Sequence, residues 1–485
     1  MALLAAAVLA VVWGALAFGA VYPWAYRPLV LMCAGTGILA LAVKGRRDVF
    51  TPALAVWCAV VAIAVALQLV PLPRGLLATI SPGTDRFLSE YDLAYRASGL
   101  MTPGSGASSG APGWPVSLAP PATVLGLCLF VSLAIFMLGL VRVLSTTGAL
   151  PAARAIVAFG VLLAVFAIAQ YVLSGGETYR LKIYGFWQPT YRGSPFGSFI
   201  NRNHFAGWML MVLPLAVMSA YGAGVSQRHS GIRGVVAWLS LSPVAAQMQL
   251  MALAAAVMGL AILLSQSRSG MAVLLFQGIL MGGLMVRRHR DTRTRVMTAA
   301  VLVIAGTVIA AWVGVDRLVS RAATVVQDLP TGGGRLWAWR DTARIIGDFP
   351  VTGTGLNTYK TAMIVYQTGA RALYFQEAHN DYLQLASEGG LLVGVPAAML
   401  IVVFIRTIRR RFTEAPQEGT TYWLRIGAVI GLAGIALQAL VEFSLQMPGN
   451  AALFAIVASL ALQRSPNLRP RSEPVARVID MPLSY

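Results

Sequence analysis

Residues 246–286 read AQMQLMALAAAVMGLAILL, SQSRSG and MAVLLFQGILMGGLMV, which are two apolar runs joined by the six residues Ser265–Gly270, five of them polar. Neither run contains a charged residue. Each approaches the ~20 apolar residues that a helix needs to cross the hydrocarbon core of a bilayer. The stretch therefore predicts a tight helical hairpin in a membrane, with Arg268 at its polar tip.

Apolar runs of this kind recur along the whole chain. Of its 485 residues, 57% are hydrophobic and 11% are charged, whereas a soluble domain carries about a quarter charged residues. We expect an all-α polytopic membrane protein with a large outer loop that carries amphipathic helices. About twelve transmembrane helices are predicted, at residues 2–21, 28–43, 51–70, 122–141, 154–174, 205–222, 246–264, 270–286, 297–315, 389–405, 423–441 and 450–463.

Charge and cysteine content narrow the function classes. The net charge is +19, but the arginines lie in short loops and form no extended basic face. Membrane lipid is therefore an expected partner and nucleic acid is not. The cysteines Cys33, Cys58 and Cys128 all lie inside apolar runs, with no CxxC or Cys/His spacing. We expect neither a metal nor another cofactor.

Basic residues in short loops predict the orientation, because cytoplasmic loops carry an excess of Lys and Arg. With the N-terminus inside, the strongly basic short loops all become cytoplasmic, namely those around Arg46, Arg142, Arg228, Arg290 and Arg409 and the tail after residue 463. Residues 1–20 contain no Lys or Arg and are read as a retained first span. Three long segments are left outside, at residues 71–121, 175–204 and 316–388, the first with a flexible linker at Thr102–Gly113.

The third outer segment contains a predicted amphipathic helix. Its apolar side chains follow a 3-4-3 spacing, at Leu336, Trp339, Ala343 and Ile346. The arginines Arg335, Arg340 and Arg344 fall on other faces. Such a helix either lies in the membrane interface or packs on the bundle.

Polar residues cluster at four places on the predicted outer side, where an unused polar group beside the membrane would be costly. The clusters are Phe199–Phe205, Ser265–Gly270, Glu377–Gly394 and Val441–Asn450. Arg202 and Arg268 could form paired hydrogen bonds to phosphate oxygens. His379, one of four histidines, could take a proton from an attacking hydroxyl near neutral pH.

Each of these residues also has a structural alternative. A lone arginine at the end of a span is often a snorkelling anchor, and a lone histidine is often a satisfied structural residue. Glu442 could simply pair with a neighbouring arginine. His204 either belongs to the site or caps the sixth span. The residue types alone leave these alternatives open.

The third cluster resembles the hallmark of the O-antigen ligase and polymerase superfamily. It reads HNDYLQLASEGGLLVG over His379–Gly394, and Gly334–Asp341 and Phe349–Asn357 are similar to the lead-in to that hallmark. Ser267–Gly270 and Glu442–Pro448 also resemble parts of the superfamily.

The resemblance implies a membrane glycosyltransferase of the GT-C type, in the bacterial inner membrane and independent of metal. Such enzymes move a glycan from undecaprenyl pyrophosphate to an acceptor hydroxyl at the periplasmic face. The family's pyrophosphate-binding arginines match Arg202 and Arg268, and its catalytic histidine matches His379. Further possible substrate contacts are Asn203, Arg335, Arg340, Tyr382 and Glu442.

The expected organisation has three parts. Residues 1–200 form N-terminal transmembrane helices with a flexible periplasmic loop, residues 201–463 form the catalytic membrane region with the loop 316–388, and residues 464–485 form a cytoplasmic tail.

Three functions remain open. A ligase, which we favour, delivers the chain to lipid A-core, whereas a polymerase delivers it to another lipid-linked unit of O-antigen or exopolysaccharide. The polar run Asn201–His204 is more typical of some exopolysaccharide-associated members. A non-catalytic transporter of the same lipid-linked glycan is disfavoured by the large outer loop and by the absence of internal repeats.

Overall fold

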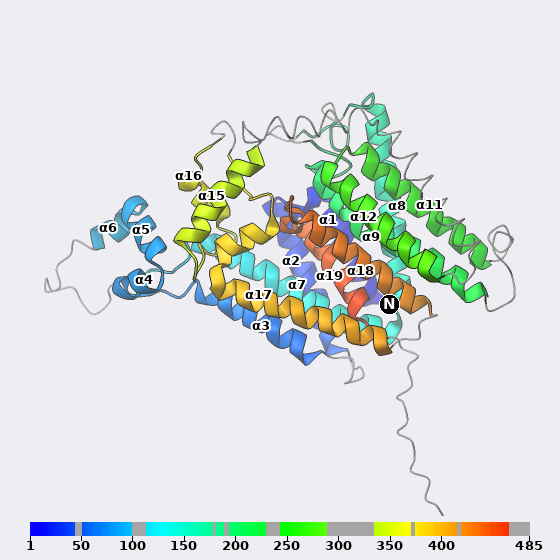
Figure 1. Cartoon of the computed structure of the whole chain (residues 1–485), viewed down its shortest axis with the longest axis horizontal. Helices are drawn as coiled ribbons and strands as arrows, with labels where there is room; N and C mark the ends of the chain where they lie inside the picture. The colour runs from blue at the N-terminus through cyan, green and yellow to red at the C-terminus, as the bar shows by residue number, and fades with distance from the viewer. Residues whose placement is uncertain are drawn as a thin grey trace, which may run out of the picture.

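The computed structural model describes residues 1–43, 51–98, 113–177, 181–188, 194–228, 243–288, 334–369, 374–414 and 419–464. Within these ranges the regular structure is helical, and β-structure is limited to isolated bridges. The long helices form an elongated bundle, with smaller helices beyond one end (Figure 1). The predicted all-α polytopic fold is confirmed.

Eight of the described helices are long and apolar enough to cross a membrane. They are α2 (Pro23–Ala42), α7 (Pro120–Thr147), α8 (Leu150–Leu173), α9 (Arg202–Arg228), α11 (Pro243–Leu264), α12 (Arg268–Arg288), α17 (Asp381–Glu414) and α18 (Thr420–Gln438). Three shorter apolar helices are α1 (Ala2–Leu16), α3 (Pro52–Leu67) and α19 (Pro448–Leu462). These helices coincide with every predicted span except 297–315, which lies outside the described residues, as does most of the predicted linker.

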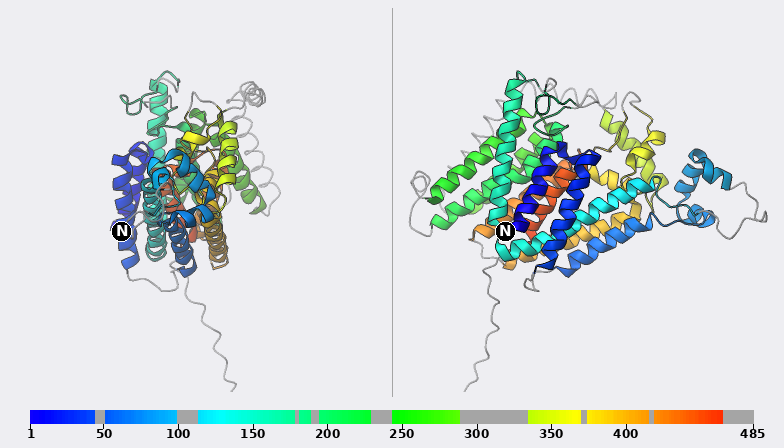
Figure 2. Two further views of the ribbon diagram at one scale, coloured as in Figure 1. Left: turned by 90° about the vertical axis from the view of Figure 1, so that its left-hand side faces the viewer. Right: turned by 180° about the vertical axis from the view of Figure 1, so that it is seen from behind.

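Helix α9 lies at the centre of the bundle and contacts α8, α11, α12, α18 and α19. Its contact with α18 depends on glycines, because a Cβ at Gly427 would lie 2.6 Å from the Pro214 carbonyl oxygen. A Cβ at Gly431 would lie 2.7 Å from the Met211 carbonyl oxygen. Small residues are the usual means by which transmembrane helices approach closely. On the far side of the molecule, α1, α2 and α19 lie side by side (Figure 2).

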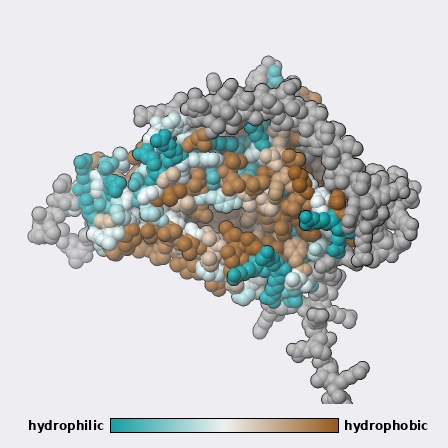
Figure 3. All heavy atoms as spheres, in the orientation of Figure 1, coloured by the Kyte–Doolittle hydropathy of each residue, from teal (hydrophilic) through white to brown (hydrophobic). Residues whose placement is uncertain are grey.

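The outer surface of the bundle is strongly apolar. Large hydrophobic side chains are exposed along the long helices, for example Ile63 on α3 at 59% and Ile401 on α17 at 52%. Hydrophobic residues dominate the visible face of the bundle, and hydrophilic residues gather over the smaller helices at one end (Figure 3). A surface of this kind is stable in lipid rather than in water.

The smaller helices are α4 (Arg74–Ile80), α5 (Pro82–Tyr91), α6 (Leu93–Ser98), α15 (Gly334–Asp348) and α16 (Tyr359–Tyr366). Helices α15 and α16 share a small core that includes Ala338, Ile345, Tyr359 and Met363. Helix α5 packs against the end of α15, since a Cβ at Gly83 would meet the Asp348 carbonyl oxygen.

The amphipathic helix predicted around residues 336–346 is confirmed as α15, but it packs through a different face. Leu336 is 41% exposed and Ala343 is also exposed, whereas Ala338 and Ile345 are buried. Hydrogen bonds of polar residues explain the difference. The Asp341 carboxylate accepts from the backbone N–H and hydroxyl of Thr368, and the Thr342 hydroxyl bonds to that of Tyr359. These bonds draw a partly polar face of the helix inward.

Helix α17 is kinked at Gly390, where φ is 53° and ψ is −156°. The irregular segment Phe349–Asn357 packs into this kink and makes the turn that Gly353 allows, with φ +64°. Irregular backbone that is buried needs partners for its polar groups. Here backbone hydrogen bonds provide them, from Thr354 N to Ser387 O, Gly355 N to Glu388 O, Leu391 N to Pro350 O and Leu392 N to Val351 O.

The two ends of the bundle differ in character. At one end the buried Arg425 donates to the carbonyl oxygens of Arg411, Ala461 and Gln463, which complements the C-terminus of α19. At the other end lie the starts of α9, α12 and α17 and the end of α18, and with them all four predicted polar clusters. That the polar end is periplasmic stays a prediction.

Candidate functional site

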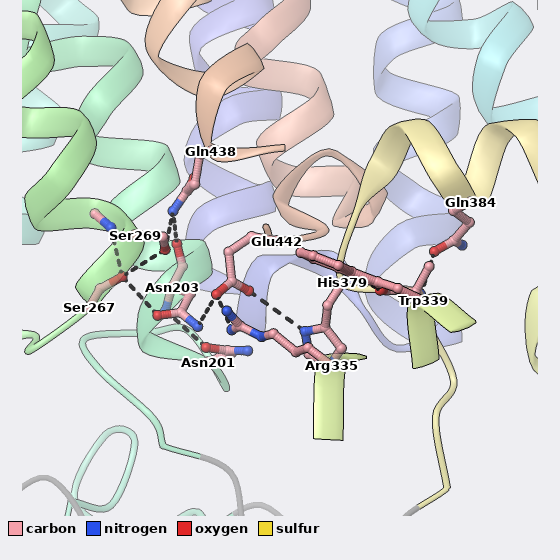
Figure 4. Close-up of polar contacts among 12 residues, drawn as sticks. Asn201, Asn203, Ser267, Ser269, Arg335, Trp339, His379, Gln384, Gln438 and Glu442 are labelled. Atoms are coloured by element: carbon pink, nitrogen blue, oxygen red, sulfur yellow. Dashed lines mark hydrogen bonds and ion pairs between the residues drawn. The ribbon is translucent and has the colours of Figure 1, made fainter. Parts of the chain in front are cut away.

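Four side chains from separate parts of the chain converge at the polar end (Figure 4). Glu442 lies between α18 and the 3-10 helix η4 (Ser444–Gln446). Asn203, in the first turn of α9, donates from Nδ2 to Glu442 Oε1 at 2.7 Å. Arg335, at the start of α15, forms an ion pair with the same oxygen. His379, two residues before α17, places Nδ1 3.8 Å from Glu442 Oε2. Sequence analysis named all four as site residues, and the fold brings them together.

Glu442 is the central residue of this cluster, and its side chain is only 1% exposed. Burial by itself raises the pKa of a carboxyl group, but the neighbouring His379 and Arg335 outweigh burial here. The pKa of Glu442 therefore lies below its ordinary value. The group is ionised at neutral pH and holds Asn203 and Arg335 through Oε1, while Oε2 faces the ring of His379.

The backbone of His379 is strained, with φ at +51°. For a residue other than glycine this conformation costs about 1–3 kcal/mol, so it persists only where the surrounding structure fixes it. Trp339 Nε1 donates to the Ala378 carbonyl at 3.0 Å on one side of His379. On the other side, Asn380 Oδ1 caps α17 by accepting two backbone N–H groups of its first turn. The imidazole is therefore directed towards Glu442 by the fold.

Phe443 separates two histidines in the site. Its ring centroid lies 4.6 Å from that of His204 and 4.7 Å from that of His379, nearly perpendicular to both. His204 is 5% exposed, and its carbonyl accepts from Asn450 Nδ2 at 3.0 Å. His204 thus packs into the site through its ring. Sequence analysis missed Phe443, because an apolar residue beside Glu442 gives no signal of its own.

The predicted hairpin of α11 and α12 is confirmed, and its polar tip is bonded to the cluster. Ser267 Oγ donates to Asn203 Oδ1 at 2.7 Å and accepts from the Gly270 N–H at 3.1 Å, as the cap of α12. Gln438, at the end of α18, donates to the Asn203 carbonyl at 3.1 Å. Asn203 therefore joins the hairpin tip and α18 to Glu442 (Figure 4).

Arg202 and Arg268 are the first residues of α9 and α12. Each is the sequence neighbour of a cluster residue, Arg202 of Asn203 and Arg268 of Ser267. The Arg268 side chain is exposed and has no hydrogen-bond partner among the described residues. Helix N-termini and guanidinium groups both favour anions. The two positions therefore suit a phosphate-containing ligand at the border of the cluster.

The other two predicted contacts lie apart from the Glu442 cluster. The guanidinium carbon of Arg340 is 5.7 Å from the Trp337 ring centroid, on the exposed side of α15. The Tyr382 hydroxyl donates to the Ala436 carbonyl at 2.9 Å and so links α17 to α18. The structure assigns neither of them a contact with His379 or Glu442.

A second polar group supports the backbone before His379. Gln384 Nε2 donates to Glu377 Oε2 at 2.5 Å, and Gln384 Oε1 accepts from the Ala378 N–H at 3.0 Å. Burial raises the pKa of Glu377 to about 8. Glu388, 2% exposed, accepts two backbone N–H groups at the start of α16. Among the described residues, no three His, Cys, Asp or Glu side chains are grouped to hold a metal ion.

A sequence model described as O-antigen ligase matches residues 253–397. This part of the chain is therefore similar to the O-antigen ligase and polymerase superfamily. The matched part contains Arg268, Arg335 and His379, while Asn203 and Glu442 lie outside it. The matched region and the segments on either side of it therefore build the cluster together.

Part of the chain is also similar to an undecaprenyl-diphosphatase of Mycobacterium avium (strain 104), with 34% identity over 139 residues. The aligned part is 26% of this chain and 45% of the relative, so the chain spans less than half of that relative's length. The family model and the apolar helices support a multi-pass membrane protein that is similar to the O-antigen ligases and polymerases.

Proposed function

We propose that this protein is a glycosyltransferase that moves a preassembled glycan from undecaprenyl pyrophosphate to an acceptor hydroxyl at the periplasmic face. The observation that carries the proposal is the convergence of His379, Arg335 and Asn203 on the buried carboxylate of Glu442, beside the arginines that begin α9 and α12. The name of the mycobacterial relative refers to the same lipid carrier. This name supports undecaprenyl as the lipid carrier of the proposed donor and says nothing about this chain's reaction.

The proposed reaction is a single displacement. The acceptor oxygen attacks the anomeric carbon, and the new carbon–oxygen bond forms as the bond to pyrophosphate breaks. The electron pair of that bond leaves with the pyrophosphate, and the acceptor proton passes to His379 Nε2. Attack opposite the leaving group inverts the anomeric configuration. The Glu442 carboxylate orients the ring through Nδ1, as a carboxylate orients the histidine in other acid–base sites.

Arginines supply the charge that the leaving group needs. Arg202 and Arg268 hold the pyrophosphate in this proposal, through paired hydrogen bonds at two helix N-termini. Arg335 is 43% exposed, so it can also face the substrate while Glu442 holds one of its nitrogens. Fixed positive charge of this kind stabilises a leaving group without reorganisation. Residues 201–463 would then form the catalytic region.

We assign the acceptor as lipid A-core, which makes the protein an O-antigen ligase. The matching family model carries that description. A polymerase would use the same donor and the same chemistry but would extend another lipid-linked unit. The acceptor therefore has to be identified by experiment.

The test is deletion of the gene and complementation with wild type or with His379→Ala. Lipopolysaccharide, secreted polysaccharide and the lipid-linked pool are compared. A ligase predicts loss of long chains from lipid A-core while long chains remain on the carrier. A polymerase predicts single repeat units on the carrier. Normal glycans with His379→Ala at wild-type protein level would contradict the proposed function.

A further inference from the structure

Six aromatic side chains gather where α1 meets α2 and on the segment 181–188, at the polar end of the bundle. They are Phe18, Tyr22, Trp24, Tyr184, Phe186 and Trp187, and we refer to them as the aromatic platform. Phe18 lies at its centre, with ring centroids 5.6 Å from Tyr184 and 4.8 Å from Trp187. Tyr22 and Trp24 stack with their ring planes 11° apart.

The backbone under the aromatic platform is strained. Phe18, Gly19 and Ala20 have φ values of 59°, 73° and 56°, and Tyr184 has a φ of 58°. Residues other than glycine rarely adopt this region, and such strain is concentrated at functional sites and ligand clamps. The Tyr184 hydroxyl also donates to the Leu16 carbonyl. The rings are therefore held in fixed positions by the fold.

The aromatic platform adjoins the Glu442 site along two paths. A Cβ at Gly19 would lie 3.2 Å from the ring of Phe199, which precedes Arg202 by three residues. The helix that follows the Glu442 loop also reaches the platform, because a Cβ at Gly449 would lie 3.0 Å from the Gly19 carbonyl oxygen. The platform therefore packs against the two segments that lead to Arg202 and away from Glu442.

Part of the aromatic platform is open to a ligand. Phe186 is 75% exposed and Trp24 is 54% exposed. Aromatic residues that only anchor a membrane protein at the interface need neither to cluster on one side of the bundle nor to have a strained backbone. A surface that presents ring faces to a ligand in a fixed arrangement does need both features.

We propose that the aromatic platform binds pyranose rings of the glycan that is transferred at His379, an inference that rests on the proposed function. One face of a pyranose carries C–H bonds and is apolar, so it stacks on the electron-rich face of an aromatic ring. The hydroxyl groups at the rim of the sugar stay in water. The platform thus holds sugars beyond the one whose bond is broken.

Photo-crosslinking tests this site without relying on transfer. We would place p-benzoylphenylalanine at Phe186 in the His379→Ala background and irradiate cells that make the lipid-linked glycan. The expected result is a ladder of glycan adducts on the protein. The matched control is the same crosslinker at Leu39 of α2, which is 61% exposed, and it should give lipid adducts alone. Lipid adducts alone at position 186 would overturn the proposal in favour of a membrane anchor.

A transfer assay separates this inference from the proposed function. Trp24→Ala is compared with Tyr91→Ala, whose side chain on α5 is similarly exposed at 56%. With a donor that carries many sugars, Trp24→Ala should raise the apparent KM about tenfold, as expected for one lost aromatic contact. With a donor that carries one sugar, Trp24→Ala should change the apparent KM little. Equal effects on both donors would refute the platform, whereas no transfer by wild type would refute the proposed function.

Discussion

Glu442 Oε2 lies 3.8 Å from His379 Nδ1, and this carboxylate is almost fully buried. Its other oxygen accepts from Asn203 and Arg335. A carboxylate beside Nδ1 favours the tautomer that carries its proton there, which leaves Nε2 able to accept one. The position of His379, the proposed proton acceptor, is thereby linked to Arg335 and to the first turn of α9.

Glu442→Gln should lower the transfer rate by roughly 10²-fold or more, because an amide of the same shape removes the charge that orients His379 and pairs with Arg335. Glu442→Asp keeps that charge and should retain part of the rate. The measurement is the transfer rate of purified protein at equal donor concentration. Wild-type activity in Glu442→Gln would show that the carboxylate has no role in the reaction.

Arg268→Ala should weaken donor use by at least tenfold, since the loss of a charge-assisted contact to phosphate typically costs about 1.5–3 kcal/mol. The matched control is Arg340→Ala, because Arg340 is equally a surface arginine but stacks on Trp337 away from the cluster. Apparent KM for the lipid-linked donor is the measured quantity. If both variants behave alike, then Arg268 is an anchor rather than a ligand of the pyrophosphate.

Gly353→Ala should lower the free energy of unfolding by about 2 kcal/mol or more. A Cβ there would lie 2.2 Å from the Glu388 carbonyl oxygen, and φ is +64°. Gly347→Ala is the control, since nothing lies within 4 Å of its Cβ position on α15. That change should be neutral or stabilising, as alanine favours a helix. Thermal unfolding in detergent compares the two, and equal midpoints would contradict the packing described at the kink of α17.

The raised pKa of Glu377 predicts that the free energy of unfolding falls as the pH rises. Its pKa is raised from 4.5 to about 8 because burial disfavours the charged form. Below its ordinary pKa the group is neutral in both folded and unfolded protein and costs nothing. As pH rises towards 8, the folded state must either hold the proton or bury a charge, so the stability falls across that window. Thermal midpoints between pH 5 and 9 should show this slope.

Glu377→Gln should flatten that dependence on pH, while Glu90→Gln, at an exposed position on α5, should leave it unchanged. An unaltered slope in Glu377→Gln would mean that another group is responsible.

The membrane helices could be predicted because each is marked by an uninterrupted apolar run. The run before Ser265 and the run after Gly270 place the hairpin within a few residues of its observed ends. The polar residues of the cluster could be predicted as well, because Asn203, His379 and Glu442 interrupt or border such apolar runs. Their placement at one end of the bundle follows from alternating spans.

The remaining features depend on tertiary contacts that leave no local pattern. The buried face of α15 includes Asp341 and Thr342, which periodicity assigns to the outside and which are buried because Thr368 and Tyr359 satisfy them. Phe443 acquires its role only when two histidines from distant segments meet its ring.

In the proposed reaction His379 takes the acceptor proton. The most direct test is single-turnover transfer by purified wild type and His379→Ala, with donor binding measured in parallel. We predict that the rate falls by roughly 10²–10⁴-fold, the usual contribution of a positioned acid–base group, while donor binding is kept. Undiminished transfer by His379→Ala would contradict the account.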